Sequence, residues 1–566
     1  MTDMATDMAH IEGFIPVPPD LAEQYRRAGY WRGEPLGDHV ARWAAQYADR
    51  TAIIDETTGT RINYHELAGH VDRLAYALLQ QGFAPGDRVV VQLPNTVDFV
   101  LLVFAFFRIG VSPIMALPPH REYEITGMIE FGGATAYVAP ATLGAFDFVG
   151  MARNIRQQYP QVTRLLFTGE APATMEPGEL SLRALLDETA PDAEMLRATL
   201  AAHRPDPSEI ALFLLSGGTT GRPKLIPRTH DDYSYNFRVS APIAGFDQET
   251  VYMAALPIAH NFPFGSPGML GALEHGGSVV LAPSPDAETA FPLIERERVT
   301  ATSLVPAAAI RWMDSPKRAE YDLSSLRVLQ VGGARIAPEA ARRVRPTFGC
   351  QLQQVFGMAE GLLNYTRLDD PDEVIIETQG RPASPADEIR IVDSFDRPVP
   401  AGEMGNLLTR GPYTIRGYFN ASAANAEAFT ADGFYRSGDV VRLHPSGSLV
   451  VEGREKDLIN RGGEKISAEE VENLLLAHPA VAQVAVVAMP DPILGERTCA
   501  FVIPNPDMTL TLSDLTTMLA ARGVAKFKWP ERLELVEAFP LTSIGKVHKK
   551  ALREHIAARI GAERGA

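Results

Sequence analysis

The stretch "DRVVVQLPNTVDFVLLVFAFFRIGVSPIMAL", from Asp87 to Leu117, joins two apolar, β-branched runs by an apolar segment of helical length. A strand, a helix of ten or more residues and a second strand in this order predict a parallel βαβ unit. The strands of parallel sheets are buried on both faces by helices and therefore read as nearly continuous apolar runs. The stretch thus predicts an α/β fold with helix-covered sheets.

The same alternation of strand-like and helix-like segments recurs across residues 277–306 and 326–357. After about residue 385 the segments become shorter, richer in turns and more β-like. A compact α+β pattern begins at "GREKDLINRGGEKIS" (453–467), in which Ser467 and Glu470 predict a capping box. We therefore expect a large N-terminal part, 1–453, with a β-rich subdomain, and a small C-terminal lid, 454–566. Ligand sites form preferentially in the cleft between two such parts.

Composition narrows the function classes. The chain has 566 residues, too many for one core, with ordinary apolar (46%) and charged (22%) fractions. A net charge of -17 argues against general nucleic-acid binding. The two cysteines make no disulfide framework, and neither a signal peptide nor a membrane span is visible. We expect a reduced, cytoplasmic protein.

The C-terminal tail is basic on an otherwise acidic chain. From Ala521 onward, ten Lys and Arg residues stand against five Glu. Such a tail is either a solvated face or a docking surface for an acidic partner. The lysines that would form this surface include Lys526, Lys528, Lys549 and Lys550.

A glycine- and hydroxyl-rich loop lies within "LLSGGTTGRPKLIPRTH", from Leu214 to His230. It is not a Walker A loop, which needs Gly-Lys-Ser/Thr leading into a helix, because Lys224 follows Pro223 and proline has no N–H to donate. The small residues before Pro223 still offer closely spaced N–H and hydroxyl donors that can wrap a polyphosphate. The loop alone is compatible with either a phosphate nest or a hairpin tip.

Four stretches together indicate a family. "SGGTTGRPK" (216–224), "YRSGD" (435–439), "GREKD" (453–457) and "PLTSIGKVHKK" (540–550) resemble, in this order, the motifs of the ANL superfamily of adenylate-forming enzymes. "HNFPFGSPG" (260–268), "QQVFGMAEGLLNYTRLDDP" (353–371) and "AEQYRRAGYWRG" (22–33) are similar to stand-alone ligases that activate 2,3-dihydroxybenzoate or salicylate for siderophores. The resemblance implies that a carboxylate and ATP form an acyl-AMP, whose acyl group is then passed to a thiol.

The resemblance also implies a nucleotide site. Carboxylate and triphosphate are both anions, so the site must cancel their repulsion and stabilise charge on the α-phosphorus. Glu360 is the expected Mg²⁺ ligand, with Thr220 nearby, and Asp439 is expected to accept both ribose hydroxyls. The expected ATP- and AMP-binding residues are Ser216, Gly217, Gly218, Thr219, Thr220, Gly221, Lys224, Asp439 and Arg454, with Gly333, Val355 and Phe356 around the adenine.

Lys546 and His260 are the expected catalytic residues. In the family the lysine ammonium bridges the substrate carboxylate and the α-phosphate, where charge builds in the transition state. Lys456 matches the position at which family members hinge the lid. The lid closes for adenylation and then rotates so that a thiol reaches the adenylate.

His260, Asn261 and Ser266 match the aryl-acid pocket of the family, with Asn261 expected to bond the ortho-hydroxyl. Ser266 is typical of dihydroxybenzoate enzymes, whereas Leu363 stands where those enzymes usually carry valine and resembles the salicylate group. One methylene discriminates by only about 1–3 kcal/mol, so overlapping acceptance is expected, with a slight preference for salicylate.

Three hypotheses concern the fate of the adenylate. The chain ends about twenty residues after Lys546, so we expect the thiol to arrive in trans, either on a phosphopantetheinyl aryl carrier protein, as the subgroup implies, or on free coenzyme A. The third hypothesis, a non-catalytic nucleotide-binding relative, is disfavoured because Lys546, Asp439, Arg454 and Glu360 are all present.

Overall fold

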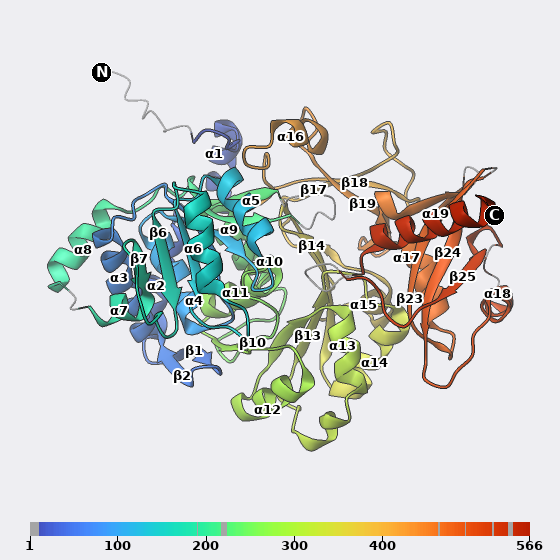
Figure 1. The fold of residues 1–566 in the computed structure, drawn as a ribbon, viewed down its shortest axis with the longest axis horizontal. Helices are drawn as coiled ribbons and strands as arrows, with labels where there is room; N and C mark the ends of the chain where they lie inside the picture. The colour runs from blue at the N-terminus through green and yellow to red at the C-terminus, as the bar shows by residue number, and fades with distance from the viewer. Residues whose placement is uncertain are drawn as a thin grey trace.

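The computed structural model describes residues 11–188, 191–216, 224–461, 464–492, 494–522, 524, 526–541 and 547–565. Their strands form four sheets. Figure 1 shows the C-terminal part, in orange and red, at one end of the molecule, with the two large helix-covered sheets occupying the rest. The predicted α/β class, with a large N-terminal part and a small α+β C-terminal part, is confirmed.

The first large sheet contains the βαβ unit of the opening stretch. Its β3 and β4 pair in parallel, with Val90 opposite Ile114, and only its β8 and β9 pair antiparallel. The strand order is β7 (Glu179–Ser181), β6 (Arg164–Thr168), β5 (Ala136–Pro140), β3 (Arg88–Gln92), β4 (Ser112–Ala116), β8 (Ile210–Leu215) and β9 (Leu225–Thr229).

The second large sheet is parallel in its centre and antiparallel at both ends. Its order is β16 (Arg381–Pro382), β15 (Gly361–Tyr365), β14 (Gln351–Met358), β13 (Val328–Gly332), β12 (Ala301–Leu304), β10 (Val251–Ala254), β11 (Ser278–Leu281), β1 (Thr51–Asp55) and β2 (Thr60–Asn63).

Helix α4 (Val97–Arg108) joins the two sheets into one core. Every residue from Phe99 to Phe107 is buried, as expected of a helix that is apolar on all sides. It packs against α2, α3, β1 and β4. The other helices of the N-terminal part are α1 (Pro19–Arg27), α2 (Leu36–Tyr47), α3 (Tyr64–Gln80), α5 (Glu122–Gly132), α6 (Phe148–Gln158), α7 (Leu182–Asp187), α8 (Ala193–Ala202), α9 (His230–Ser240), α10 (Asn261–Gly265), α11 (Gly268–Glu274), α12 (Ala287–Glu297), α13 (Pro306–Asp314), α14 (Pro338–Phe348), α15 (Asp372–Glu377) and α16 (Ser422–Ala428).

The β-rich subdomain is an antiparallel sheet of β17 (Glu388–Val392), β18 (Gly405–Arg410), β19 (Tyr435–Leu443) and β20 (Leu449–Arg454). Arg454 is the last residue of β20, and a 3-10 turn, Glu455–Asp457, leads to Leu458, the first residue of the next sheet. The change of sheet thus falls close to the proposed boundary between 453 and 454, which stays a prediction.

The lid sheet is built from β21 (Leu458–Arg461), β22 (Glu464–Ser467), β23 (Val481–Asp491), β24 (Gly495–Pro504) and β25 (Arg532–Leu535), with helices α17 (Ala468–Leu476), α18 (Leu512–Ala521) and α19 (Lys549–Gly565). The Ser467 hydroxyl accepts from the Glu470 amide at 3.0 Å, as predicted. The predicted capping box is otherwise wrong, because the Glu470 carboxylate binds Lys528 at 2.6 Å instead of returning to Ser467.

The described helices include none with both the length and the apolar character needed to span a bilayer. Cys350 and Cys499 are both buried as free thiols, and burial raises the pKa of each to about 12.

Candidate active site

The ends of the glycine-rich loop are held together. The Ser216 amide donates to the Lys224 carbonyl and the Lys224 amide to the Ser216 hydroxyl, each at 3.0 Å. The Lys224 ammonium lies 4.3 Å from the ring centroid of Tyr418. Residues 217–221, like Lys546, lie outside the described residues, so their expected roles stay predictions. The described ends place the loop at the carboxyl end of β8, beside Tyr418.

Tyr418 connects this loop to Glu360. Its hydroxyl donates to the buried Glu360 carboxylate at 2.8 Å and lies 2.9 Å from the hydroxyl of Tyr435. Burial, reinforced by the Glu360 charge, raises the pKa of both tyrosines, so both phenols stay protonated. Tyr418 therefore contacts the Glu360 carboxylate, the Tyr435 hydroxyl and the Lys224 ammonium at once.

Glu360 fits the expected Mg²⁺ site. Mg²⁺ prefers oxygen ligands and is usually bound by one or two carboxylates together with substrate phosphates. Within the described part of the chain, no group of three or more His, Cys, Asp or Glu side chains could hold a metal ion by itself. A single carboxylate linked through Tyr418 to the glycine-rich loop is compatible with an ion that arrives with ATP.

Asp439 and Arg454 face each other across β19 and β20. Arg454 Nε lies 2.9 Å from Asp439 Oδ1, and the guanidinium also donates to the Ser437 carbonyl at 2.8 Å. Burial by itself lowers the pKa of Arg454, but Asp439, with smaller contributions from Tyr435 and Glu360, raises it overall. The two expected ribose residues are therefore neighbours. Glu360 is close enough to contribute to the raised pKa of Arg454.

The three expected adenine residues do not share one wall. Gly333 is exposed with a positive φ of 79°, a conformation that favours glycine. Val355 packs with the aryl-pocket residues, whereas Phe356 packs under the β-rich sheet with Leu362 and Val441. Adjacent strand residues point to opposite faces. Phe356 is half-buried, so the expected stacking on the adenine would use the exposed part of its ring.

The aryl-acid residues come together around Phe262. Helix α10 begins at Asn261, and its cap His260 accepts from the Phe262 amide at 3.4 Å. Phe262 packs in one cluster with Val355 and Leu363. A Cβ at Gly332 would lie 3.0 Å from the Phe262 ring, so glycine leaves room for that ring. Sequence reasoning did not select Phe262, although it lies between Asn261 and Ser266 in the quoted motif.

Two polar atoms interrupt this apolar wall. Asn261 is 6% exposed, and its Oδ1 accepts from the hydroxyl of Tyr233 at 2.8 Å. The Ser266 hydroxyl is buried and has no hydrogen-bond partner within the described residues. A buried hydroxyl left unpaired costs about 1–3 kcal/mol, so a ligand that pairs with it is favoured. Tyr233 is the second residue of the site that the sequence motifs did not mark.

Leu363 is held from behind by a polar chain. Its amide donates to the Tyr413 hydroxyl at 3.4 Å, and that hydroxyl donates to the buried carboxyl of Asp387. Burial raises the pKa of Asp387 to about 7. A Cβ at Gly357 would lie 2.5 Å from Leu363 Cδ2, so the leucine fills the space beside β14. Leu363 therefore has little freedom to move away from a ligand.

The N-terminal stretch 22–33 forms the outer layer of this wall. Tyr25 and Trp31 belong to the same cluster as Phe262 and Leu363. The Trp31 indole donates to the Pro412 carbonyl at 2.9 Å, next to Tyr413. The N-terminal motif 22–33 therefore packs against the expected aryl-acid residues from far away in the sequence.

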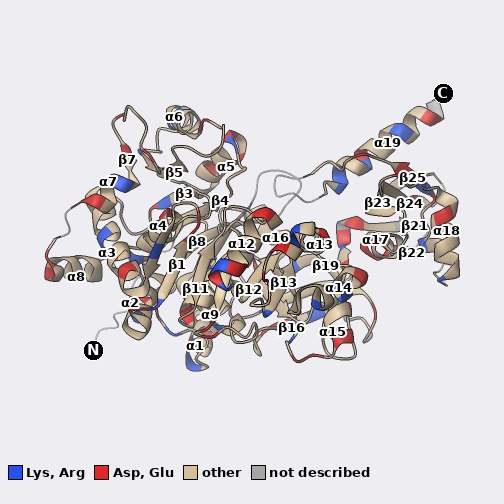
Figure 2. Cartoon of the chain, turned by 90° about the horizontal axis from the view of Figure 1, so that it is seen from below, with Lys and Arg blue, Asp and Glu red and all other residues tan. Residues whose placement is uncertain are grey.

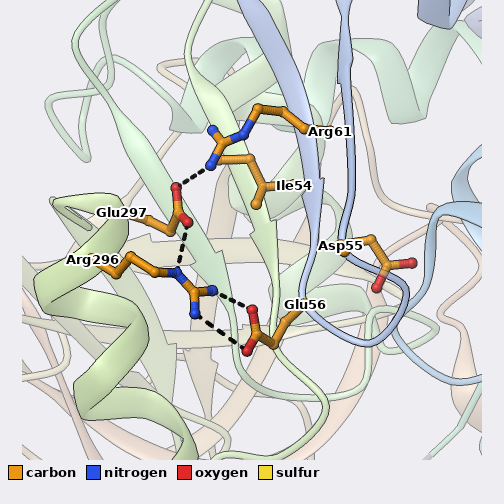
Figure 3. Close-up of a pocket in the computed structure, with 7 residues that line it drawn as sticks. Ile54, Asp55, Glu56, Arg61, Arg296 and Glu297 are labelled. Atoms are coloured by element: carbon orange, nitrogen blue, oxygen red, sulfur yellow. Dashed lines mark hydrogen bonds and ion pairs between the residues drawn. The ribbon is translucent and has the colours of Figure 1, made fainter.

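A separate surface hollow of about 440 Å³ lies between the β1–β2 hairpin and α12 (Figure 3). Its charges are paired with one another. Arg61 contacts Glu297 at 2.7 Å, and Arg296 contacts Glu297 at 3.0 Å and also Glu56. These pairs engage both arginines, while Asp55 accepts from backbone amides, and we assign no ligand to the hollow.

The basic tail is less free than expected. Lys528 pairs with Glu470 and Lys549 with Glu472, each at 2.6 Å, while Lys550 lies 3.8 Å from Glu554. Figure 2 shows blue and red residues along α19 rather than one basic face. The choice between a solvated face and a docking surface therefore stays open, with Lys528 and Lys549 partly neutralised by their ion pairs.

Comparison with known proteins agrees with this geometry. The AMP-binding enzyme family matches residues 40–419, and the C-terminal domain of AMP-binding enzymes matches residues 470–546. A salicylyl-CoA synthase / salicylate adenylyltransferase from Streptomyces sp is 54% identical, over 96% of this chain and 97% of the relative. A 2,3-dihydroxybenzoate-AMP ligase from Bacillus subtilis is 52% identical, over 97% of this chain and 99% of the relative.

Among solved structures, the apo structure of MbtA from Mycobacterium smegmatis is 45% identical with a TM-score of 0.72, covering 96% of this chain and 98% of that one. The family match spans most of the chain and includes the loop, Glu360 and the aryl-acid residues. The relationship indicated by the four motifs is thereby confirmed: the chain belongs to the AMP-binding enzyme family and is an adenylate-forming ligase.

Proposed function

We propose that the enzyme activates salicylate or 2,3-dihydroxybenzoate with ATP and transfers the aryl group to the thiol of an aryl carrier protein. The observation that carries the proposal is the pair of polar groups, Asn261 and Ser266, set in an apolar wall with Phe262 and Leu363. An apolar pocket with few polar groups fits an aromatic ring with polar substituents. The substrates named for the two curated relatives support this choice.

In the first half-reaction a carboxylate oxygen attacks the α-phosphorus, and the bond to the pyrophosphate oxygen breaks. Lys546 places its charge between the carboxylate and the α-phosphate, while Asp439 and Arg454 hold the ribose. Glu360 would hold Mg²⁺, which would supply positive charge against the phosphates when ATP is bound. In the second half-reaction a thiol sulfur attacks the acyl carbon and AMP leaves. The cytoplasm, which supplies ATP, is the proposed location.

The pocket favours salicylate but admits the dihydroxy acid. Leu363 is immobilised and occupies volume that a smaller residue would leave to the ring, which favours the smaller acid. The unpartnered hydroxyl of Ser266 favours a second ring hydroxyl. These opposed effects predict acceptance of both acids, with salicylate preferred.

The test is ATP–pyrophosphate exchange across benzoate, salicylate, 2,3-dihydroxybenzoate, anthranilate and several aliphatic acids. We expect exchange to depend on the aryl acid, with salicylate giving the highest kcat/KM. Lys546→Ala is the negative control, expected to abolish exchange while leaving ATP binding within a few-fold. Exchange stimulated better by aliphatic acids, or by no acid, would overturn the proposal.

A further inference from the structure

Tyr233 holds the side-chain amide of Asn261. The tyrosine lies on α9 and the asparagine at the start of α10, and the two side-chain oxygens are 2.8 Å apart. Both residues are more than nine-tenths buried. The contact lies directly beneath the pocket that the proposed function assigns to the aryl acid, on which this inference rests.

The polarity of this hydrogen bond is determined by the tyrosine. Burial raises the pKa of Tyr233, so its phenol stays protonated. Among the described residues, Asn261 is the one hydrogen-bond partner of that hydroxyl. A buried O–H without an acceptor is costly, so the proton must point at the carbonyl oxygen of the amide. The NH₂ group of Asn261 is then turned the other way.

Tyr233 has little freedom to release this contact. Its ring stacks on Phe264 at 5.9 Å between centroids, and the guanidinium of Arg228 lies 4.8 Å from its ring centroid. A Cβ at Gly265 would lie 2.7 Å from the Tyr233 hydroxyl, so this glycine allows α10 to approach it. The donor is therefore fixed by packing on several sides.

The Asn261 NH₂ group has no hydrogen-bond partner among the described residues. It stands on the short helix that also carries Phe262 and precedes Ser266. We propose that Tyr233 is a positioning residue that makes Asn261 present only a donor to the ligand. The site then selects benzoates whose ortho substituent accepts a hydrogen bond.

Two isosteric acids separate this selection from simple pocket size. In salicylate the hydroxyl donates to its own carboxylate, which leaves the phenol oxygen to accept from Asn261. In anthranilate the amine also donates to the carboxylate, but its second N–H faces outward and its lone pair is delocalised into the ring. The outward N–H would meet the N–H of Asn261, and two donors repel. A freely turning amide could instead offer its oxygen.

The experiment compares kcat/KM for exchange with salicylate, benzoate and anthranilate in the wild type and in Tyr233→Phe. In the wild type we expect salicylate to exceed benzoate and anthranilate to fall below it. In Tyr233→Phe the amide can turn, so the salicylate-to-anthranilate ratio should fall roughly three- to tenfold, about what one hydrogen bond contributes. Benzoate, which has no ortho group, should change little.

Two controls separate positioning from a general structural role. Tyr252→Phe removes another fully buried hydroxyl, which bonds Ser303 at 3.1 Å, and should leave the ratio unchanged. In an Asn261→Ala background, Tyr233→Phe should no longer alter the ratio, because its effect acts through the amide.

The outcomes are distinguishable. A wild type that responds to no benzoate overturns the proposed function, and this inference with it. A wild type that uses salicylate, with an unchanged ratio in Tyr233→Phe, overturns only the inference. Should the variant fail to fold, the wild-type order decides: anthranilate at or above benzoate overturns the selection of acceptor groups, and anthranilate below benzoate supports it.

Discussion

At the scale of single residues, we propose that the size of Leu363 influences the choice between the two acids. The side chain is buried, and its Cδ2 fills the space that a Cβ at Gly357 would need. Leu363→Val should raise kcat/KM for 2,3-dihydroxybenzoate relative to salicylate. One methylene is worth roughly 1–3 kcal/mol in such a pocket, so the ratio should change about tenfold or more.

The adjacent residue provides a matched control. Leu362 is equally buried, but it packs on the opposite face of β15 with residues of the β-rich sheet. Leu362→Val removes the same methylene and should leave the ratio of the two acids unchanged, whatever it does to stability. If both variants shift the ratio alike, or neither shifts it, Leu363 does not determine specificity.

At the scale of elements, helix α17 brings an unusual carboxyl against the N-terminal part. Burial, reinforced by Glu472, raises the pKa of Glu469 from 4.5 to about 7, while Lys549 and Arg335 act in the opposite direction. The folded protein therefore retains this proton to higher pH than the unfolded chain. The contribution of Glu469 to the free energy of unfolding therefore falls as the pH rises from 4.5 to about 7, and it is constant above that pH.

Glu469→Gln should therefore raise the melting temperature above pH 7 and have no effect below pH 4.5, measured by thermal unfolding across this range. Glu472→Gln is the comparison variant, because it removes the ion-pair partner of Lys549 at 2.6 Å and also the like charge that raises the pKa of Glu469. The lost ion pair and the relieved repulsion act in opposite directions, so its melting temperature at pH 8 should rise less than that of Glu469→Gln. A Glu469→Gln variant less stable than wild type at pH 8 would contradict the assignment.

The elements were largely predictable from the sequence, because strand and helix periodicities are local. The βαβ unit 87–117 and the later alternations are found where they were expected. Strand alternation sends the side chains of Val355 and Phe356 to opposite faces, so their expected roles beside the adenine, backbone contact for Val355 and stacking for Phe356, stay predictions. Local patterns also identified Ser467 as a helix cap. They did not indicate that Lys528, which is distant in the sequence, binds the Glu470 carboxylate instead.

The site was predictable only where motifs carried it. Asp439 and Arg454 lie in recognisable stretches, and the structure pairs them. Tyr233 is 28 positions before Asn261 in the chain, so only the packing of α9 under α10 reveals their contact. The support that Trp31 gives the pocket likewise spans hundreds of positions, and no local pattern encodes it.

At the scale of the whole molecule, the charge distribution bears on how a carrier protein would meet the enzyme. The net charge is -17, so an acidic carrier is repelled by most of the surface. In the basic stretch from Ala521 onward, Lys528 and Lys549 are held in ion pairs with Glu470 and Glu472 of the same lid. Arg522 and Lys526 are exposed on the lid and are the better candidates for contact with a carrier.

Reversal of both charges, Arg522→Glu with Lys526→Glu, should slow aryl transfer to a separate acidic carrier severalfold at low salt, and less at moderate salt. Exposed charges act mainly on encounter rates, and salt screens them. Pyrophosphate exchange, which needs no carrier, should be unchanged. Arg197→Glu, on α8 at the far end of the molecule from the lid (Figure 1), is the control and should affect neither half-reaction.

The same assay decides between the two acceptors. A carrier must dock on the protein surface, so its loading should depend on the lid charges, whereas free coenzyme A needs no docking surface. We expect the carrier to be the faster acceptor at equal concentration and the difference to shrink in the charge-reversed enzyme. Faster transfer to coenzyme A in the wild type would replace the carrier by coenzyme A as the acceptor. Carrier loading that ignores both salt and charge reversal would place the docking surface away from Arg522 and Lys526.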